Sequence, residues 1–405
     1  MRLRPDPTWA EYARLRRAIA GEALPLALCD LDALETNVDR LLARVRPGQA
    51  LRVASKSVRC PALLEAICAR GGGRISGLMC YSAREARVLA DRGFSDLLVA
   101  YPSAQPADVS TLAELATRGL RVAAVIDSPA QMDPLARAAC ARGVSVRVVV
   151  ELDVSLRLFG ARLGVLRSPV RTPDEVVALA RAARETRGLE FGGVMGYEAQ
   201  VAGLPDRSPF SRATNPLRAA LRRASVPRVA ARRRAVAEAL TRAGLPAPLF
   251  NGGGTGSLIE TAREPWVSET TAGSGFLASH LFDYYSGLEL VPAAMFALQV
   301  ARTPGRGVVT CHGGGYVASG AAGADRLPRP HLPRGLELVP LEGAGEVQTP
   351  VRGAAARALR PGDPVFFRHA KAGELAEHFG EYLLVRGDQL VGRAPTYRGL
   401  GHSFA

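Results

Sequence analysis

Three features of other protein classes are missing from this chain of 405 residues. It has no uncharged apolar run of about 18 residues, so we expect no membrane span and no membrane partner. The N-terminal segment lacks the unbroken apolar stretch of a signal peptide, and we therefore expect a cytoplasmic protein. The six cysteines include no Cys-x-x-Cys pair. This spacing favours reduced, buried thiols over a disulfide framework or a zinc ribbon.

Lysine is also nearly missing. Of the 52 basic residues, only Lys56 and Lys371 are lysines, and all the others are arginines. Arginine is sufficient wherever a plain cation is needed, but only a lysine amine can lose its proton and attack a carbonyl group. The two lysines are therefore candidate sites of chemistry.

The formal net charge of +14 raises the question of a nucleic-acid partner. Because the excess is almost entirely arginine in a chain rich in glycine and proline, we interpret it as compositional bias on a solvated surface. We therefore expect no nucleic-acid partner. The Arg-rich stretch at residues 205–234 is predicted to be a long loop that leads into a helix, with phosphate or nucleic-acid binding as the alternative.

Strands and helices alternate over the first two thirds of the chain. Short aliphatic or β-branched runs are separated by segments of helical periodicity, such as the one that contains Leu34, Val38, Leu41 and Val45. This alternation requires parallel strands joined by crossover helices. Eight strands are predicted, at residues 51–56, 75–82, 96–102, 121–127, 145–153, 189–198, 247–252 and 267–273. Eight is the number of strands that closes a (β/α)8 TIM barrel.

The pattern changes after about residue 283, where short strands alternate with turns that contain Gly, Pro and Asp. This pattern predicts an antiparallel β domain. We expect a barrel domain at residues 1–285 and a β domain at residues 286–405. A strand at residues 25–31 is left over from the barrel, and the N-terminal segment would contribute it to the β domain.

Lys56 lies at the end of the first predicted barrel strand. In a TIM barrel the working residues lie at the carboxyl ends of the strands. Because the strand is apolar, we expect the Lys56 amine to be buried. Burial would lower its pKa and leave it partly neutral, ready to form a Schiff base with an aldehyde. The alternative is a lysine at the edge of a strand that points into water.

Two glycine-rich segments follow the last two predicted barrel strands. They are residues 250–260 (FNGGGTGSLIE) and residues 271–275 (TAGSG). Backbone amides that converge at such turns bind anions, and barrel enzymes commonly hold a phosphate at this position. The alternative is a pair of tight turns that merely need glycine. An aldehyde-reactive amine and a phosphate site in one barrel mouth together indicate pyridoxal phosphate.

In these segments and beyond them, the sequence resembles the fold-type III pyridoxal-phosphate enzymes, specifically the branch of D-threonine aldolase and eukaryotic-type D-serine dehydratase. Alanine racemase is a more distant relative. The resemblance covers nearly the whole chain, including LALCDLDALETNV, GVMGYEAQ, NGGGTGS, SETTAGSG and PGDPVFFRHAKAG. It implies that Lys56 binds pyridoxal 5'-phosphate as a Schiff base, that Tyr197 lies beside the cofactor, and that Arg157 or Arg162 lies near the cofactor hydroxyl. The residues that it implies around the phosphate are Gly253, Gly254, Thr255, Gly273 and Ser274.

The sequence departs from this resemblance at the metal site. Relatives bind a divalent metal through His-x-Cys or His-x-Asp, whereas this chain has His369, Ala370 and Lys371. A protonated lysine cannot ligate a metal, so His369 is left as a weak ligand for Mn²⁺ or Zn²⁺ that Glu374 or His378 could assist. We hypothesise that the Lys371 ammonium takes the place of the metal and stabilises negative charge on a substrate oxygen. The alternative is a surface lysine on a turn.

The resemblance implies a lyase that acts on small D-β-hydroxy amino acids. The reaction is either retro-aldol cleavage to glycine and an aldehyde, or elimination of water followed by deamination. The resemblance also implies a homodimer, since relatives of this fold type are dimers with shared active sites. One alternative is an amino-acid racemase, for which the sequence shows no firm second base. The other is a non-catalytic pyridoxal-phosphate-binding protein, which would not need a full β domain.

Overall fold

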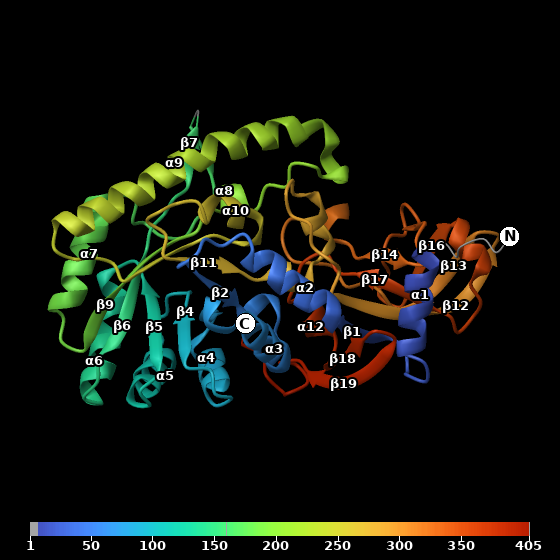
Figure 1. The fold of residues 1–405 in the computed structure, drawn as a ribbon, viewed down its shortest axis with the longest axis horizontal. Helices are drawn as coiled ribbons and strands as arrows, with labels where there is room; N and C mark the ends of the chain where they lie inside the picture. Colours follow the sequence, from blue (N-terminus) through green and yellow to red (C-terminus); the bar gives the residue numbers. More distant parts are fainter. Residues whose placement is uncertain (1–6, 159, 405) are drawn as a thin grey trace.

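The computed structural model describes residues 7–158 and 160–404, and its two bodies lie side by side (Figure 1). The body at the left of Figure 1 is a set of parallel strands surrounded by helices. The body at the right is an antiparallel sheet, against which the N-terminal helix α1 (Pro7–Ala18) lies. None of the helices within the described ranges is long and apolar enough to cross a bilayer.

The first body is a closed barrel of parallel strands in the order β10-β11-β2-β3-β4-β5-β6-β9. The strands are β2 (Ala50–Ala54), β3 (Ile75–Cys80), β4 (Asp96–Val99), β5 (Arg121–Ile126), β6 (Val146–Glu151), β9 (Leu189–Gly196), β10 (Leu249–Gly252) and β11 (Glu269–Ala272). Each coincides with a predicted strand, so the predicted TIM barrel is confirmed. At the amino ends of the strands, the buried Arg52 side chain pairs with Asp96 and Glu269, which closes the bottom of the barrel.

Helices connect the strands and cover the outside of the barrel. The longer ones are α2 (Leu31–Leu42), α3 (Pro61–Gly71), α4 (Ala83–Ala90), α5 (Pro106–Thr117), α6 (Pro129–Ala141), α7 (Pro173–Glu185) and α9 (Asn215–Arg242). The Arg-rich stretch at residues 205–234 differs in part from its prediction, because helix α9 already begins at Asn215. Its Arg233 side chain is fully buried and pairs with Glu198 and Glu264, so this polar helix is held against the barrel by charge. In Figure 1 it runs along the upper edge of the view, on the outside of the barrel.

The second body is a nine-stranded sheet in the order β15-β16-β13-β12-β1-β18-β19, in which β17 also pairs with β12, and β14 pairs with β17. Its strands are β1 (Leu26–Asp30), β12 (Ala294–Gly305), β13 (Val308–His312), β14 (Arg329–Leu332), β15 (Leu336–Leu338), β16 (Gln348–Gly353), β17 (Pro364–Arg368), β18 (Glu381–Arg386) and β19 (Gln389–Pro395). Strand β1 precedes the barrel in the chain, yet it lies between β12, to which it is antiparallel, and β18, to which it is parallel. The predicted antiparallel β domain after the barrel is confirmed.

The sheet and the barrel meet beside Lys56. Tyr397, which follows β19, donates its backbone amide to the carbonyl oxygen of Arg59 and its hydroxyl to Glu85. A Cβ at Gly373 would lie 2.1 Å from the carbonyl oxygen of Lys56, so this close approach requires glycine. The loop after β17 therefore lies directly against the turn that carries Lys56.

Candidate active site

Lys56 lies at the carboxyl end of β2, in the short helix η1 (Ser55–Ser57). Its Nζ donates a hydrogen bond of 2.6 Å to the hydroxyl of Tyr101 and lies 5.3 Å from the centre of that ring. The Lys56 side chain is exposed, so the prediction of a buried amine was wrong. The strand itself is buried, but it ends at Ala54, and Lys56 leaves the turn beyond it toward the open mouth of the barrel.

Tyr101 was not among the predicted site residues, although it lies two residues after the carboxyl end of β4. Burial disfavours the ionised phenol, but the positive charges of Lys56 and Arg167 outweigh this effect and lower the pKa of Tyr101. The guanidinium carbon of Arg167 lies 5.7 Å from the centre of the Tyr101 ring and 5.4 Å from that of Tyr197. Two cations and two tyrosines therefore line this end of the barrel. A polar residue just after a barrel strand was a usable signal for Tyr101.

The turns after β2, β10 and β11 come together at the same end of the barrel. Thr255 Oγ1 accepts hydrogen bonds from the amides of Gly273 (3.3 Å) and Gly275 (3.0 Å). The hydroxyl oxygens of Ser57 and Ser274 are 3.4 Å apart. A Cβ at Gly273 would lie 2.6 Å from Ser57 Oγ, so the packing of these turns requires glycine. The two predicted phosphate-binding segments are thus next to each other and next to the turn of Lys56.

Glu198 holds the first glycine-rich turn in place. Its buried carboxylate accepts hydrogen bonds from the amide of Gly253 (3.2 Å) and from the hydroxyls of Ser257 (2.5 Å) and Thr261 (2.6 Å). It also pairs with the buried guanidinium of Arg233. Burial opposes its ionisation, but the charge of Arg233 and these hydrogen bonds outweigh burial and lower the pKa of Glu198. Neither partner was predicted, because Arg233 looks like any other arginine of an Arg-rich stretch.

Tyr197 follows β9, and its ring lies against the same turn. A Cβ at Gly254 would lie 3.0 Å from Tyr197 Cε2, so backbone and ring are in direct contact. Burial raises the pKa of Tyr197 to about 12, and the negative charge of Glu198 acts in the same direction. The phenol therefore remains protonated and forms a fixed wall of the site.

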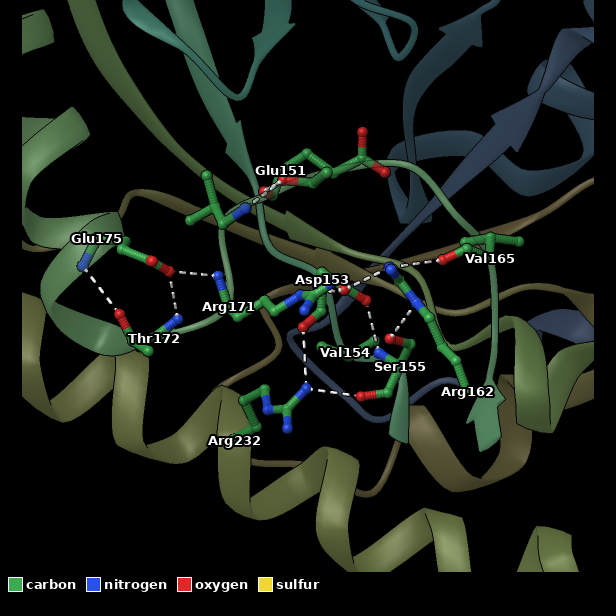
Figure 2. Close-up of polar contacts among 12 residues, drawn as sticks. Glu151, Asp153, Val154, Ser155, Arg162, Val165, Arg171, Thr172, Glu175 and Arg232 are labelled. Atoms are coloured by element: carbon green, nitrogen blue, oxygen red, sulfur yellow. Dashed lines mark hydrogen bonds and ion pairs between the residues drawn. The ribbon is translucent and has the colours of Figure 1, made fainter. Parts of the chain in front are cut away.

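The structure distinguishes the two arginines that the sequence offered as alternatives. Arg157 is exposed on strand β7 (Leu156–Leu158). Arg162, on the paired strand β8 (Ala161–Leu163), donates to Asp153 at 2.7 Å and to the hydroxyl of Ser155 at 3.1 Å (Figure 2). Arg162 is thus engaged by a buried carboxylate, and the arginine that lies against Tyr101 is Arg167.

Lys371 lies on the loop after β17, in the antiparallel sheet domain. Its Nζ donates to Ser319 Oγ at 3.2 Å and lies 3.4 Å from the Ser319 carbonyl oxygen. Burial lowers the pKa of the half-buried Lys371, and the positive charge of Lys56 adds to this effect. Because Gly373 of the same loop contacts the Lys56 carbonyl, the two lysines belong to one mouth.

His369 is buried, and burial lowers the pKa of its imidazole to about 3, so the ring is neutral and could itself ligate a metal. The partners that the sequence suggested for it are engaged elsewhere. Glu374 accepts hydrogen bonds from the amide of Ser319, and the ring of His378 stacks on that of Tyr316 at 4.5 Å. Across the described residues, no group of three or more His, Cys, Asp or Glu side chains is placed to hold a metal ion. The donor set at His369 therefore does not fit a divalent metal.

Sequence comparison identifies one family and several curated relatives. The profile of the family described as alanine racemase, N-terminal domain, matches residues 29–273. The 3-hydroxy-D-aspartate aldolase of Paracoccus denitrificans (strain Pd 1222) is 28% identical over 255 residues, and the D-threonine aldolase of Arthrobacter sp. is 29% identical over 252 residues. Each match covers 62% of this chain but only 59% and 60% of the respective relative, which is less than two thirds of its length.

Solved structures extend the likeness beyond the barrel. The D-threonine aldolase from Filomicrobium marinum superposes with a TM-score of 0.78 at 23% identity, over 93% of this chain and 95% of that one. The D-threo-3-hydroxyaspartate dehydratase from Delftia sp. HT23 superposes with a TM-score of 0.74 at 21% identity, over 94% and 98% of the two chains. At these identities the likeness shows a shared fold, which includes the antiparallel sheet domain.

Proposed function

Because this chain belongs to the alanine racemase N-terminal domain family, we propose that it is a pyridoxal-phosphate-dependent lyase that acts on small D-β-hydroxy amino acids. The observation that carries the proposal is the arrangement of the barrel mouth, where the exposed Lys56 amine and both glycine-rich turns lie together. The names of the curated relatives, D-threonine aldolase and 3-hydroxy-D-aspartate aldolase, support the substrate class.

The residues of this mouth fit pyridoxal phosphate. The cofactor carries an aldehyde, which needs an amine, and a phosphate, which needs several hydrogen-bond donors. Lys56 would supply the amine. The amides of Gly253, Gly254 and Gly273 already donate to Glu198, Ser257 and Thr255, so these glycines would shape the phosphate site and not donate to it. The hydroxyls of Thr255 and Ser274 would donate to the phosphate, and Tyr197 would flank the cofactor.

When bound, the cofactor withdraws electrons from the bonds around the α-carbon of an attached amino acid. The chain's own residues bind, orient and move protons. Lys56 would hold the cofactor and, once the substrate amine has displaced it, act as a base. The Tyr101 oxygen accepts a hydrogen bond from Lys56 Nζ at 2.6 Å and has a lowered pKa, so it can exchange a proton with this amine. Tyr197, whose phenol stays protonated, would keep the cofactor oriented.

We further propose that Lys371 acts on the β-hydroxyl of the substrate. It comes from the antiparallel sheet domain, and its loop lies against the turn of Lys56. In retro-aldol cleavage the hydroxyl loses its proton and the Cα–Cβ bond breaks, whereas in dehydration the Cβ–O bond breaks and the oxygen leaves. Negative charge develops on the same oxygen in both reactions, and an ammonium group beside it would stabilise that charge.

Binding of the cofactor to Lys56 is the first test. The purified chain is mixed with pyridoxal phosphate, reduced with borohydride, digested, and analysed by mass spectrometry. We expect a yellow protein that loses its colour on reduction and carries the cofactor mass on Lys56. The Lys371→Met variant should be labelled equally, and Lys56→Ala should not be labelled. A chain that remains colourless, or a Lys56→Ala variant that is as yellow as the wild type, would contradict the proposal.

Substrate and reaction are tested with a panel of D- and L-β-hydroxy amino acids, with and without Mn²⁺ or Zn²⁺. Aldehyde and ammonia are assayed separately, because the first reports retro-aldol cleavage and the second reports deamination. We expect turnover of D-amino acids without added metal. Turnover only in the presence of a metal would contradict the role of Lys371 and favour His369.

We also propose that the protein is a cytoplasmic homodimer, with a barrel domain at residues 1–285 to which strand β1 does not belong, and a β domain at residues 286–405. The pairing of β1 with β12 and β18 supports this division. Light scattering should give twice the mass of one chain, and a monomer would contradict the dimer.

A further inference from the structure

The first observation is that Asp153 engages the arginine expected from sequence. Its buried carboxylate pairs with Arg162 at 2.7 Å and with Arg171 at 3.0 Å, and it also accepts the backbone amide of Ser155 at 2.8 Å. Arg232 of helix α9 fixes the same segment from below, by donating to the carbonyl oxygens of Asp153 and Ser155 (Figure 2). The Arg162 guanidinium is therefore part of a structural cluster, and it would have to leave a buried carboxylate to reach a ligand.

The second observation is that Arg167 is held beside Lys56 without a polar partner of its own. Its guanidinium lies against the rings of Tyr101 and Tyr197, and Lys56 Nζ lies against the same Tyr101 ring. Among the described residues, Arg167 forms no hydrogen bond and no ion pair within 4.0 Å, and its side chain is exposed. An arginine has five N–H donors in a planar fork that matches a carboxylate.

The third observation is that the segment around Arg167 is anchored. The hydroxyl of Ser168 donates to the carbonyl oxygen of Glu151 at 2.7 Å and accepts the amide of Val170 at 3.1 Å. The side chain of Glu151 points away from the Asp153 cluster in Figure 2, and the charge of Arg167 acts on it. The cation is thus presented by a fixed backbone and not by a free loop.

From this geometry we infer that Arg167 binds the carboxylate of the amino-acid substrate, while Arg162 has a structural role. The inference rests on the proposed function, because it takes Lys56 as the position of the substrate amine. The amino and carboxylate groups of an amino acid are attached to the same carbon, so the groups that bind them must lie close together. Lys56 and Arg167 meet this requirement, because both lie against the ring of Tyr101. The cofactor hydroxyl, in its ionised form, is the other anion that could reach this guanidinium, and the experiment separates the two.

The experiment compares two ligands that differ in the carboxylate alone, D-alanine and its amide D-alaninamide. Neither has a hydroxyl group, so neither can undergo retro-aldol cleavage or dehydration. Dissociation constants are measured from the absorbance change of the cofactor-loaded protein, and the affinity for the cofactor is measured separately on the apoprotein. For the wild type we expect D-alanine to bind at least about tenfold more tightly than D-alaninamide, because the contact with the carboxylate is a charge-assisted hydrogen bond.

In Arg167→Met this preference should fall to within about twofold, while cofactor affinity changes by less than about threefold; Arg167→Lys should keep part of the preference. The matched control is Arg181→Met, an exposed arginine on α7, which should behave as the wild type. Arg162→Met should lower thermal stability and keep the preference. The inference is overturned if Arg167→Met loses cofactor affinity and keeps the preference, or if the preference disappears in Arg162→Met instead. A wild type that binds no cofactor would contradict the proposed function.

Discussion

The buried pair of Arg233 and Glu198 allows the support of the first glycine-rich turn to be tested. The side chain of Arg233 is fully buried and that of Glu198 is 2% exposed, and Arg233 also pairs with Glu264. The substitution Arg233→Met removes the cation and leaves two buried carboxylates without their partner. Breaking a buried ion pair from one side costs about 3–5 kcal/mol. We therefore expect the free energy of unfolding to fall by about that amount.

Helix α9 offers a matched control in the next residue. Arg234 is exposed and pairs with Glu238 one turn away, so Arg234→Met should cost only about 0.3–0.5 kcal/mol. The assay is urea unfolding of the apoprotein at pH 7, followed by far-ultraviolet circular dichroism. Fluorescence is less suitable, because the Arg234 guanidinium lies 5.8 Å from the Trp266 ring. Equal losses in the two variants would refute the reasoning.

Two further measurements test whether the unpaired charge of Glu198 causes the loss of stability in Arg233→Met. In Arg233→Met with Glu198→Gln, one uncompensated charge is gone, so part of the lost stability should return. The pKa of Glu198 is lowered in the folded protein, since Arg233 outweighs the opposing effect of burial. The pair therefore stabilises the protein above the ordinary carboxyl pKa, and this contribution is lost as the pH falls. The difference between wild type and Arg233→Met should accordingly narrow toward acid pH.

Three other predictions concern the barrel mouth. Burial raises the pKa of Glu151 from 4.5 to about 7, so the folded state binds this proton more tightly than the unfolded state and stability falls as the pH rises through that window. Glu151→Gln should therefore be more stable than the wild type in urea at pH 8, by up to about 3 kcal/mol, and no more stable at pH 4; an equal difference at both pH values would argue against a buried, protonated Glu151. Lys371→Met should reduce kcat about 100-fold or more with cofactor affinity nearly unchanged, and equal loss of both, or loss of neither, would exclude a role in charge stabilisation. Tyr101→Phe removes the hydroxyl that accepts a hydrogen bond from Lys56 and should lower kcat by about 100-fold without preventing borohydride labelling of Lys56; unchanged turnover would assign Tyr101 a packing role only.

The barrel could be predicted from the sequence because each of its strands is a short apolar run closed by a turn. The same local signal placed Lys56 and the glycine-rich turns at the ends of strands, where parallel strands must bring them together. The hydroxyls of Ser57 and Ser274 show this adjacency, because they lie 3.4 Å apart although the residues are 217 positions apart in the sequence.

What could not be predicted depends on partners that are distant in sequence. Whether Lys56 is buried depends on where the strand ends, and one turn of helix beyond Ala54 was enough to expose it. The pairing of Arg162 with Asp153 depends on the hairpin between them, so spacing alone could not show which arginine stays free. Arg233 differs from the exposed Arg234 only in the carboxylates that the fold brings to it.

The central place of β1 in the antiparallel sheet also determines when that sheet can be completed. Its neighbours β12 and β18 emerge from the ribosome only after all the barrel strands have been synthesised. At a rate of synthesis of about 5–20 residues per second, β12 and β18 are made roughly tens of seconds after β1. The nascent chain can thus close its barrel, with Lys56 in place, before the loop of Lys371 is made. A chain that ends before β12 would therefore contain the barrel strands and Lys56 but neither Lys371 nor the partners of β1.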